Sequence, residues 1–246
     1  MKNVALMISS MAALAMLLVG HSLAPARSGA AKLRSDESSV AYAAPAPAPA
    51  AALAASVEEM RAVAAKVSAG GVFLDGFWGA AFNMRRLPYT TPRIAPYTGQ
   101  IRTSCGPVGA NNAYYCPNDH TIYYDVLFLA RMMRTVGAGL GTDGDMAPIT
   151  IIAHEWGHAV QRQLGLRGLL TIGRELQADC LAGAFVRGAY QARRLDPGDV
   201  EEARFVLAMG GDELPWFHKE AHGRPAERVN SFLAGLNEGA SACGCF

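Results

Sequence analysis

Two histidines four residues apart constrain this chain more than any other feature. His154, Glu155 and His158 form an H-E-x-x-H sequence within an apolar segment. Positions i and i+4 share one face of a helix, so both imidazoles can reach one metal ion. Glu155 is displaced around the helix and can hold a water molecule beside that ion. The segment therefore predicts a helix from about residue 147 to 164 that carries a zinc site.

A zinc site of this kind needs a third protein ligand and leaves its fourth position to water. The longer metzincin pattern requires a histidine at position 164, where this chain has Leu164, so that class is excluded. Glu175 and Asp179 share one face of the following apolar helix, where buried carboxylates need cationic partners. We expect Glu175 to bind the metal and Asp179 to accept the Nδ1–H of a ligand histidine. Exchange of these two roles is the alternative.

The first 54 residues have the features of an export segment followed by a spacer. Residues 4–20 form an apolar run, and residues 24–26 fit a cleavage site, which predicts a signal peptide over residues 1–26. An uncleaved membrane anchor through residues 4–20 is the alternative, because the run is only slightly short for a span. Alternating Ala and Pro within residues 27–54 predict an extended, disordered linker. Either export route places the folded part outside the cytoplasm, where it is secreted, periplasmic or anchored to the membrane.

The composition fits one folded domain over residues 55–246 and argues against a nucleic-acid partner. Hydrophobic residues make up 51% of the chain, which is enough to form a core. Lys and Arg number 22 against 21 for Asp and Glu, a formal net charge of +1. A chain with this balance has no basic field that would attract nucleic acid.

Helical patterns dominate the folded part. A capping box at Ser56 and Glu59 predicts a helix that ends at Gly70 and Gly71. A second short helix should follow, with aromatic residues on one face. Further helices are predicted over residues 126–136, 168–192, 200–209 and 225–236, with a glycine-rich loop over 137–145.

Two segments rich in β-forming residues, 112–116 and 121–125, flank a turn and predict a hairpin. The expected fold is therefore α+β and mainly helical, with a small hairpin or sheet beside the helix of the two histidines. Cys105 and Cys116 flank the first strand of this hairpin and should form a disulfide in an exported protein. Cys180 is expected to be a buried thiol, although Cys243 or Cys245 could pair with it or with another chain.

The stretch from Cys105 onward resembles the neutral zinc metallopeptidase family of bacteria. The site is also similar to that of prenyl-protein and heat-shock membrane endopeptidases, in which the Glu of an E-x-x-x-D motif completes the zinc site. The resemblance implies a zincin-like fold over residues 55–246, one zinc ion per chain, and hydrolysis of peptide bonds in a protein or peptide substrate. The matching segments are 105–106, 115–117, 121–125, 152–158, 161, 163–165, 174–180, 198–199, 222–223 and 228–229.

The resemblance also implies two residues near the metal, His222 and Arg228. The first would donate to the developing oxyanion, and the second would brace a carboxylate such as Asp179. The chain departs from the family pattern at residues 224–225, where small hydroxyl residues are commoner. In this reading Glu155 is the general base of a zinc-dependent endopeptidase. The alternative is a non-catalytic zinc-binding chaperone or assembly factor with the same fold, against which the intact Glu155 argues, because that carboxylate is not needed to bind the metal.

Overall fold

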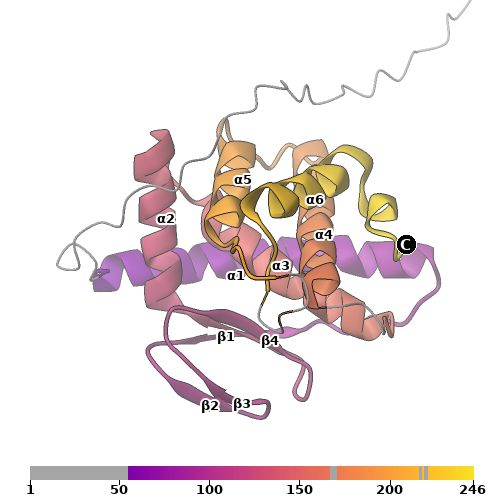
Figure 1. The fold of residues 1–246 in the computed structure, drawn as a ribbon, viewed down its shortest axis with the longest axis horizontal. Helices are drawn as coiled ribbons and strands as arrows, with labels where there is room; N and C mark the ends of the chain where they lie inside the picture. The colour runs from indigo at the N-terminus through magenta and orange to yellow at the C-terminus, as the bar shows by residue number, and fades with distance from the viewer. Residues whose placement is uncertain (1–54, 167–170, 216–217, 219–220) are drawn as a thin grey trace, which may run out of the picture. The chain divides into compact units, whose positions relative to one another are not determined.

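The computed structural model describes residues 55–166, 171–215, 218 and 221–246. Within them the predicted α+β, mainly helical fold is confirmed (Figure 1). The predicted signal or anchor (1–26) and linker (27–54) lie outside the described residues. Across the described ranges, no helix is both long and apolar enough to cross a bilayer. The elements are α1 (Val57–Met84), β1 (Arg93–Tyr97), β2 (Ile101–Thr103), β3 (Gly106–Val108), β4 (Ala113–Cys116), β5 (Thr121–Asp125), α2 (Val126–Leu140), α3 (Met146–Gln163), α4 (Thr171–Gln191), α5 (Asp199–Met209), α6 (Pro225–Glu238) and the 3-10 helix η2 (Ala240–Cys243).

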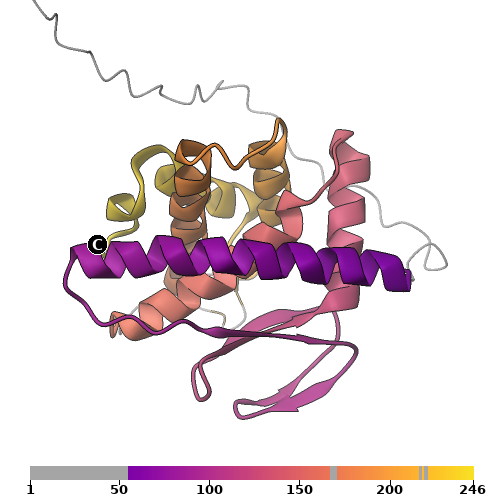
Figure 2. The ribbon, with the colours of Figure 1, turned by 180° about the vertical axis from the view of Figure 1, so that it is seen from behind.

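Helix α1 begins at the capping box that the sequence predicts. The Ser56 hydroxyl accepts from the Glu59 N–H at 3.1 Å, and the Glu59 carboxylate accepts from the Ser56 N–H at 2.6 Å. The helix buries a stripe that includes Val67, Leu74 and Trp78. Figure 2 shows it running as one long helix across the neighbouring helices.

The predicted end of this helix at Gly70 and Gly71 is wrong, and so is the separate second helix, because α1 continues to Met84. The two glycines mark close packing. A Cβ atom at Gly70 would lie 2.6 Å from Cδ1 of Ile149, and one at Gly71 would lie 2.6 Å from Cδ1 of Ile94. A larger residue at either position would force the isoleucine side chain to move, so the glycines allow α1 to pack closely on α3 and β1.

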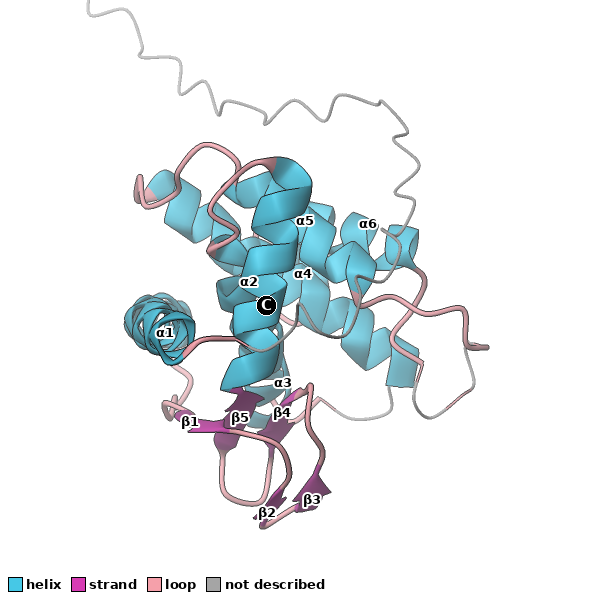
Figure 3. Cartoon of the chain, turned by 90° about the vertical axis from the view of Figure 1, so that its left-hand side faces the viewer, coloured by secondary structure: helices cyan, strands magenta, loops and turns pink. Residues whose placement is uncertain are grey.

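The predicted hairpin is confirmed and belongs to a three-stranded sheet with the order β1-β5-β4. Strand β4 pairs with β5 in antiparallel register, with Tyr115 opposite Ile122. Strand β1 pairs with the other side of β5 in parallel, with Ile94 opposite Ile122. Strands β2 and β3 form a separate antiparallel pair. Strand β4 is consequently an edge strand, and Figure 3 shows the sheet below the helices.

Helix α2 follows β5 directly, because Asp125 ends the strand and caps the helix. Its carboxylate accepts from the Leu127 N–H at 3.0 Å. The helix runs to Leu140, four residues past its predicted end, and stops at Gly141 in the left-handed conformation (φ 70°). Residues 137–140, the start of the loop predicted over 137–145, are therefore helical. The start of the helix predicted over 168–192 falls partly on residues 168–170, outside the described residues.

Two disulfides cross-link the described part of the chain. Cys105 and Cys116 are bonded, the pairing expected from the sequence. Cys180 and Cys243 are also bonded, so Cys180 is not a free thiol and the choice left open by the sequence falls on Cys243. Cys245 is a free cysteine. Two disulfides indicate an oxidising, extracytoplasmic environment.

Candidate metal centre

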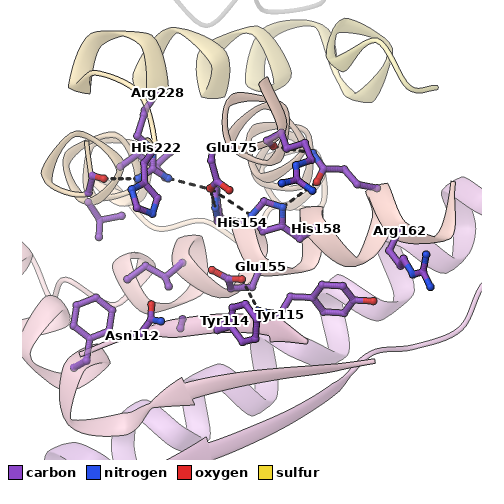
Figure 4. Close-up of a pocket in the computed structure, with 18 of the residues that line it drawn as sticks. Asn112, Tyr114, Tyr115, His154, Glu155, His158, Arg162, Glu175, His222 and Arg228 are labelled. Atoms are coloured by element: carbon purple, nitrogen blue, oxygen red, sulfur yellow. Dashed lines mark hydrogen bonds and ion pairs between the residues drawn. The ribbon is translucent and has the colours of Figure 1, made fainter. Parts of the chain in front are cut away.

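Three side chains from two helices converge on one point. His154 and His158 extend from α3 and Glu175 from α4. Oε2 of Glu175 lies 3.1 Å from Nε2 of His154 and 3.5 Å from Nε2 of His158. One potential ligand atom from each residue lies within 4.8 Å of the other two. Figure 4 shows the three side chains pointing toward one another.

The two helices can approach this closely because α3 carries a glycine between its histidines. A Cβ atom at Gly157 would lie 3.0 Å from both the Cα and the carbonyl oxygen of Ala178 on α4. Any larger residue would push α4 away from α3. The short gap brings Glu175 and Asp179 within reach of the imidazoles.

The Nδ1 atom of His154, on the side of the ring away from Glu175, contacts a buried ion pair. Its Nδ1 lies 2.7 Å from Oδ1 of Asp179, whose side chain is fully buried. Arg228 of α6 donates to both oxygens of the same carboxylate, each at 2.8 Å, and also to the carbonyl of Gly210 at 2.8 Å. His154 therefore donates its Nδ1–H to Asp179 and directs its Nε2 lone pair toward the metal position.

The Nδ1 atom of His158 contacts a side-chain amide. Its Nδ1 lies 2.9 Å from Oε1 of Gln161, one helical turn further along α3. This contact leaves the Nε2 lone pair of His158 free as well. Two imidazole nitrogens, one carboxylate oxygen and an open side facing the cleft form a donor set that fits zinc.

The charged groups of the site shift one another's pKa values. Burial opposes ionisation of Glu175, but the contacts of its carboxylate with His154 and His158 outweigh burial and lower the pKa of the carboxyl. Burial likewise opposes ionisation of Asp179, while the Arg228 guanidinium and His154 lower its pKa. Both carboxylates are therefore ionised at neutral pH, as a cation site requires.

Glu155 lies beside the three candidate ligands. Its Oε2 accepts a hydrogen bond of 2.8 Å from the backbone N–H of Tyr115 in β4. The side chain is buried, and burial raises the pKa of its carboxyl. The other carboxylate oxygen faces the cleft, as Figure 4 shows.

His222 lies on the loop between α5 and α6, at the opposite end of the site from His158. Its Nδ1 lies 2.9 Å from Oδ2 of Asp212, which also accepts from the His222 N–H at 2.9 Å. The imidazole is about half exposed, with 53% of its surface accessible. It lines the same cleft as His154, Glu155 and Arg228.

The site opens into a cleft with a volume of about 970 Å³. One wall is the edge strand β4 with the adjoining turn, and the opposite wall comes from α4 and the loop before α6. Helix α2 and helix α5 close one end with apolar side chains that include Phe128 and Leu207. A groove beside an edge strand is suited to an extended chain.

Comparison with known proteins now identifies the family. A model of the family described as "Putative neutral zinc metallopeptidase" matches residues 5–246. The chain belongs to this family. Membership in it implies zinc as the metal.

Relatives of the family occur in distant bacteria. The chain is 34% identical over 194 residues to "Uncharacterized protein YpfJ" of Escherichia coli strain K12, a match that covers 69% of this chain and 66% of that protein. It is 30% identical over 213 residues to "Uncharacterized protein Mb2605" of Mycobacterium bovis and "Uncharacterized protein Rv2575" of Mycobacterium tuberculosis H37Rv, covering 73% of this chain and 69% of each relative. The chain thus spans about two thirds of the length of these relatives. No solved structure gives a significant match.

The structure brings together all the side chains that the sequence singles out for this site. Glu175, and not Asp179, faces the two Nε2 atoms, and Arg228 contacts Asp179. Sequence reasoning missed the roles of three groups: the Tyr115 N–H that holds Glu155, the Gln161 amide and the Asp212 carboxylate. Only Gln161 carried a local signal, because it lies three residues after His158 on the same helix face.

Proposed function

We propose that this chain is a zinc-dependent endopeptidase that binds one zinc ion and hydrolyses peptide bonds in extracytoplasmic proteins or peptides. The observation that carries the proposal is the position of Glu155. A protein that only stored or displayed the metal would need His154, His158 and Glu175, but not a further buried carboxylate that faces the same cleft. Family membership supports the zinc site, and the cleft supports an extended substrate.

Each side chain then has a chemical task. Bound zinc supplies Lewis-acid chemistry, which polarises a carbonyl and lowers the pKa of a water molecule. Glu155 takes a proton from the attacking water and passes it to the leaving amine. The Tyr115 N–H fixes the position of that carboxylate. Because His222 gives its Nδ1–H to Asp212, it donates from Nε2 to the substrate oxygen as an imidazolium, whose charge meets the negative charge that develops there.

The substrate backbone is proposed to add to the free edge of β4. Because Tyr115 donates to Glu155, the outer edge of this strand faces the site. Ala113, Tyr114 and Tyr115 all line the cleft. An extended peptide can therefore pair with β4 in antiparallel fashion and place its carbonyl between Glu155 and the metal ligands.

The Glu155→Gln variant tests the proposal. It keeps the three ligands and the hydrogen bond from Tyr115, so zinc content should stay the same as in the wild type. Hydrolysis of a quenched-fluorescent peptide library should fall by about 10²–10⁴-fold, because the base is lost. Zinc content by metal analysis serves as the matched control. Equal cleavage by the wild type and the variant would exclude Glu155 as the base.

The competing function is a non-catalytic zinc-binding chaperone or assembly factor. It predicts that the wild-type, zinc-loaded protein cleaves no peptide in the library, with or without chelator. The proposed membrane attachment through residues 4–20 is tested separately by fractionation of cells that express the full chain.

A further inference from the structure

The charged side chains that line the cleft differ in whether they have partners. Glu155, Glu175 and Arg228 are all engaged in the contacts of the metal centre. Arg162 and Arg174 also line the cleft, but both are exposed. Within the described part of the chain, neither of these two guanidinium groups makes a hydrogen bond or an ion pair. They are the positive charges of the cleft that remain free to meet a substrate.

Both arginines lie at the same end of the cleft. Arg162 follows His158 by four residues on α3, one turn or about 6 Å along the helix. Arg174 immediately precedes Glu175 on α4. Figure 4 shows Arg162 beyond His158, on the side away from Asn112 and His222. Among the described residues that line the cleft, the free positive charge therefore lies at one end.

The charge of Arg162 acts on the strand that we propose to bind substrate. Burial raises the pKa of Tyr115 to about 12, and the nearby Arg162 guanidinium opposes this rise. Tyr115 lies near the carboxyl end of β4, next to Pro117 and Asn118, which also line the cleft. Arg162 thus lies near the carboxyl end of this strand. Arg174 is held at the same end of the cleft, because its carbonyl accepts a hydrogen bond of 2.8 Å from Gln161, the residue before Arg162.

The direction of the strand decides which part of a substrate meets the arginines. Strand β4 runs from Ala113 to Cys116. A peptide that pairs with it in antiparallel fashion runs the opposite way, so its amino-terminal residues lie beside Tyr115 and its carboxyl-terminal residues lie beside Asn112. The arginines therefore face residues on the amino-terminal side of the scissile bond. The free carboxylate of a substrate lies on the other side, so the anionic group available here is the side chain of Asp or Glu.

We propose that Arg162 and Arg174 select substrates with an acidic side chain two or three residues before the scissile bond. The inference rests on the proposed function and on the antiparallel binding mode. The position follows from the geometry of the two elements. A strand advances roughly 3.3 Å per residue, so the turn of α3 that separates Arg162 from His158 corresponds to about two residues of substrate.

Binding tests the proposal without any need for turnover. The zinc-loaded Glu155→Gln protein is titrated with fluorescently labelled octapeptides that carry Glu or Gln at one scanned position. Glu on the amino-terminal side should bind about two- to ten-fold more tightly than Gln, the range expected for one or two exposed ion pairs. The preference should shrink at high salt, because exposed charges are screened.

Matched variants assign the preference to the two arginines. In the double variant Arg162→Gln and Arg174→Gln the affinities for Glu and Gln peptides should become equal. In Arg61→Gln, which removes an exposed arginine of α1 outside the cleft, the preference should persist. Equal affinities for Glu and Gln in the parent protein, or a preference that survives in the double variant, would overturn the proposal. Melting temperatures of all variants show whether they are folded.

Hydrolysis by the wild-type protein separates this inference from the proposed function. Cleavage sites read by mass spectrometry should show Asp or Glu enriched two or three residues before the cut. Cleavage without such enrichment would overturn the acidic selectivity and leave the peptidase function standing. Binding selectivity in a protein that cleaves nothing would instead overturn the peptidase function and leave the recognition site standing.

Discussion

Nδ1 of His158 lies 2.9 Å from Oε1 of Gln161, and the amide of Gln161 cannot turn to present its nitrogen instead. That nitrogen donates to the carbonyl of Arg174 at 2.8 Å and to the side chain of Gln177 at 3.0 Å. Gln177 in turn donates to the carbonyl of Cys243 at 2.9 Å. The proton on His158 is therefore placed on Nδ1 by a chain of amides that ends at the carboxyl-terminal segment, and Nε2 is left free for metal.

The first prediction concerns this amide chain. Gln161→Ala should lower the affinity for zinc by about 10–100-fold, because a ligand histidine loses the group that fixes its ring and tautomer. Competition with a chromogenic chelator measures the affinity. Gln191→Ala, at an exposed position at the end of α4, is the control and should leave the affinity unchanged. An unchanged affinity in Gln161→Ala would show that His158 does not need its partner.

The second prediction concerns the buried carboxylate of Asp179. Asp179→Asn keeps the shape but removes the charge that pairs with Arg228. It should destabilise the fold by about 3–5 kcal/mol, because a buried guanidinium loses its counter-ion. It should also weaken zinc binding by roughly 10–100-fold. Glu175→Ala, by contrast, should abolish zinc occupancy with a smaller loss of stability. Full zinc occupancy in Glu175→Ala would refute its role as a ligand.

The third prediction concerns His222, whose ring is anchored on one side and free on the other. His222→Ala should retain zinc and fold, while kcat falls by about 10²–10³-fold with little change in KM. Asp212→Asn should give a smaller loss, because the ring keeps its position on the loop but loses its orienting partner. Steady-state kinetics on one library peptide measures both. A kcat within twofold of the wild type in His222→Ala would show that the residue is idle.

The local parts of this site could be read from the sequence because helices fix their own spacing. The pairs His154 with His158 and Glu175 with Asp179 are each separated by one helical turn, so each pair had to share a face. How the two helices meet depends on Gly157 and Ala178, and a contact between elements leaves no periodic signal in either.

The errors in the predicted fold also arise at contacts between elements. Gly70 and Gly71 have the sequence of a helix end, yet they lie inside α1, where Ile149 and Ile94 pack against them. Strand β1 pairs in parallel with β5, 28 residues away in the case of Arg93 and Thr121. No turn chemistry links two parallel strands, so this pairing leaves no local signal in the sequence.

The fourth prediction compares the two disulfides. Cys180 and Cys243 close a loop with a sequence separation of 63, and Cys105 and Cys116 close one of 11. Loop entropy then predicts a contribution of about 4 kcal/mol from the first bond and about 3 kcal/mol from the second. The double variant Cys180→Ser and Cys243→Ser should therefore melt lower than Cys105→Ser and Cys116→Ser. It should also bind zinc more weakly, because it frees the carbonyl that holds Gln177.

Differential scanning calorimetry and chelator competition check these two effects on the same samples. The variant without Cys105 and Cys116 serves as the matched control for zinc binding, because that bond lies on the β4 side and does not contact the amide chain. Equal zinc affinity in both double variants would show that the carboxyl-terminal segment does not affect zinc binding.

The fifth prediction concerns a carboxyl group outside the cleft. Burial raises the pKa of Asp199 to about 6, and the neighbouring carboxylates of Asp145, Glu202 and Asp196 add to the rise. Lys66 pairs with Asp145 rather than with Asp199. The native state therefore holds a proton on Asp199 that the unfolded state releases near pH 4. Between about pH 4 and pH 6 the folded protein binds more protons, so this group's contribution to stability is lost as the pH rises.

Asp199→Asn removes that titration and keeps an oxygen that can accept from the Asp196 N–H, a bond of 2.8 Å in the wild type. The melting temperature of the variant minus that of the wild type should rise from pH 4 to pH 6 and stay level above pH 6. Taking the difference at each pH cancels the loss of zinc in acid, which affects both proteins. Asp143→Asn, at an exposed position in the loop between α2 and α3, is the control. A difference for Asp199→Asn that does not change between pH 4 and pH 7 would mean that this carboxyl is ionised in the native protein throughout that range.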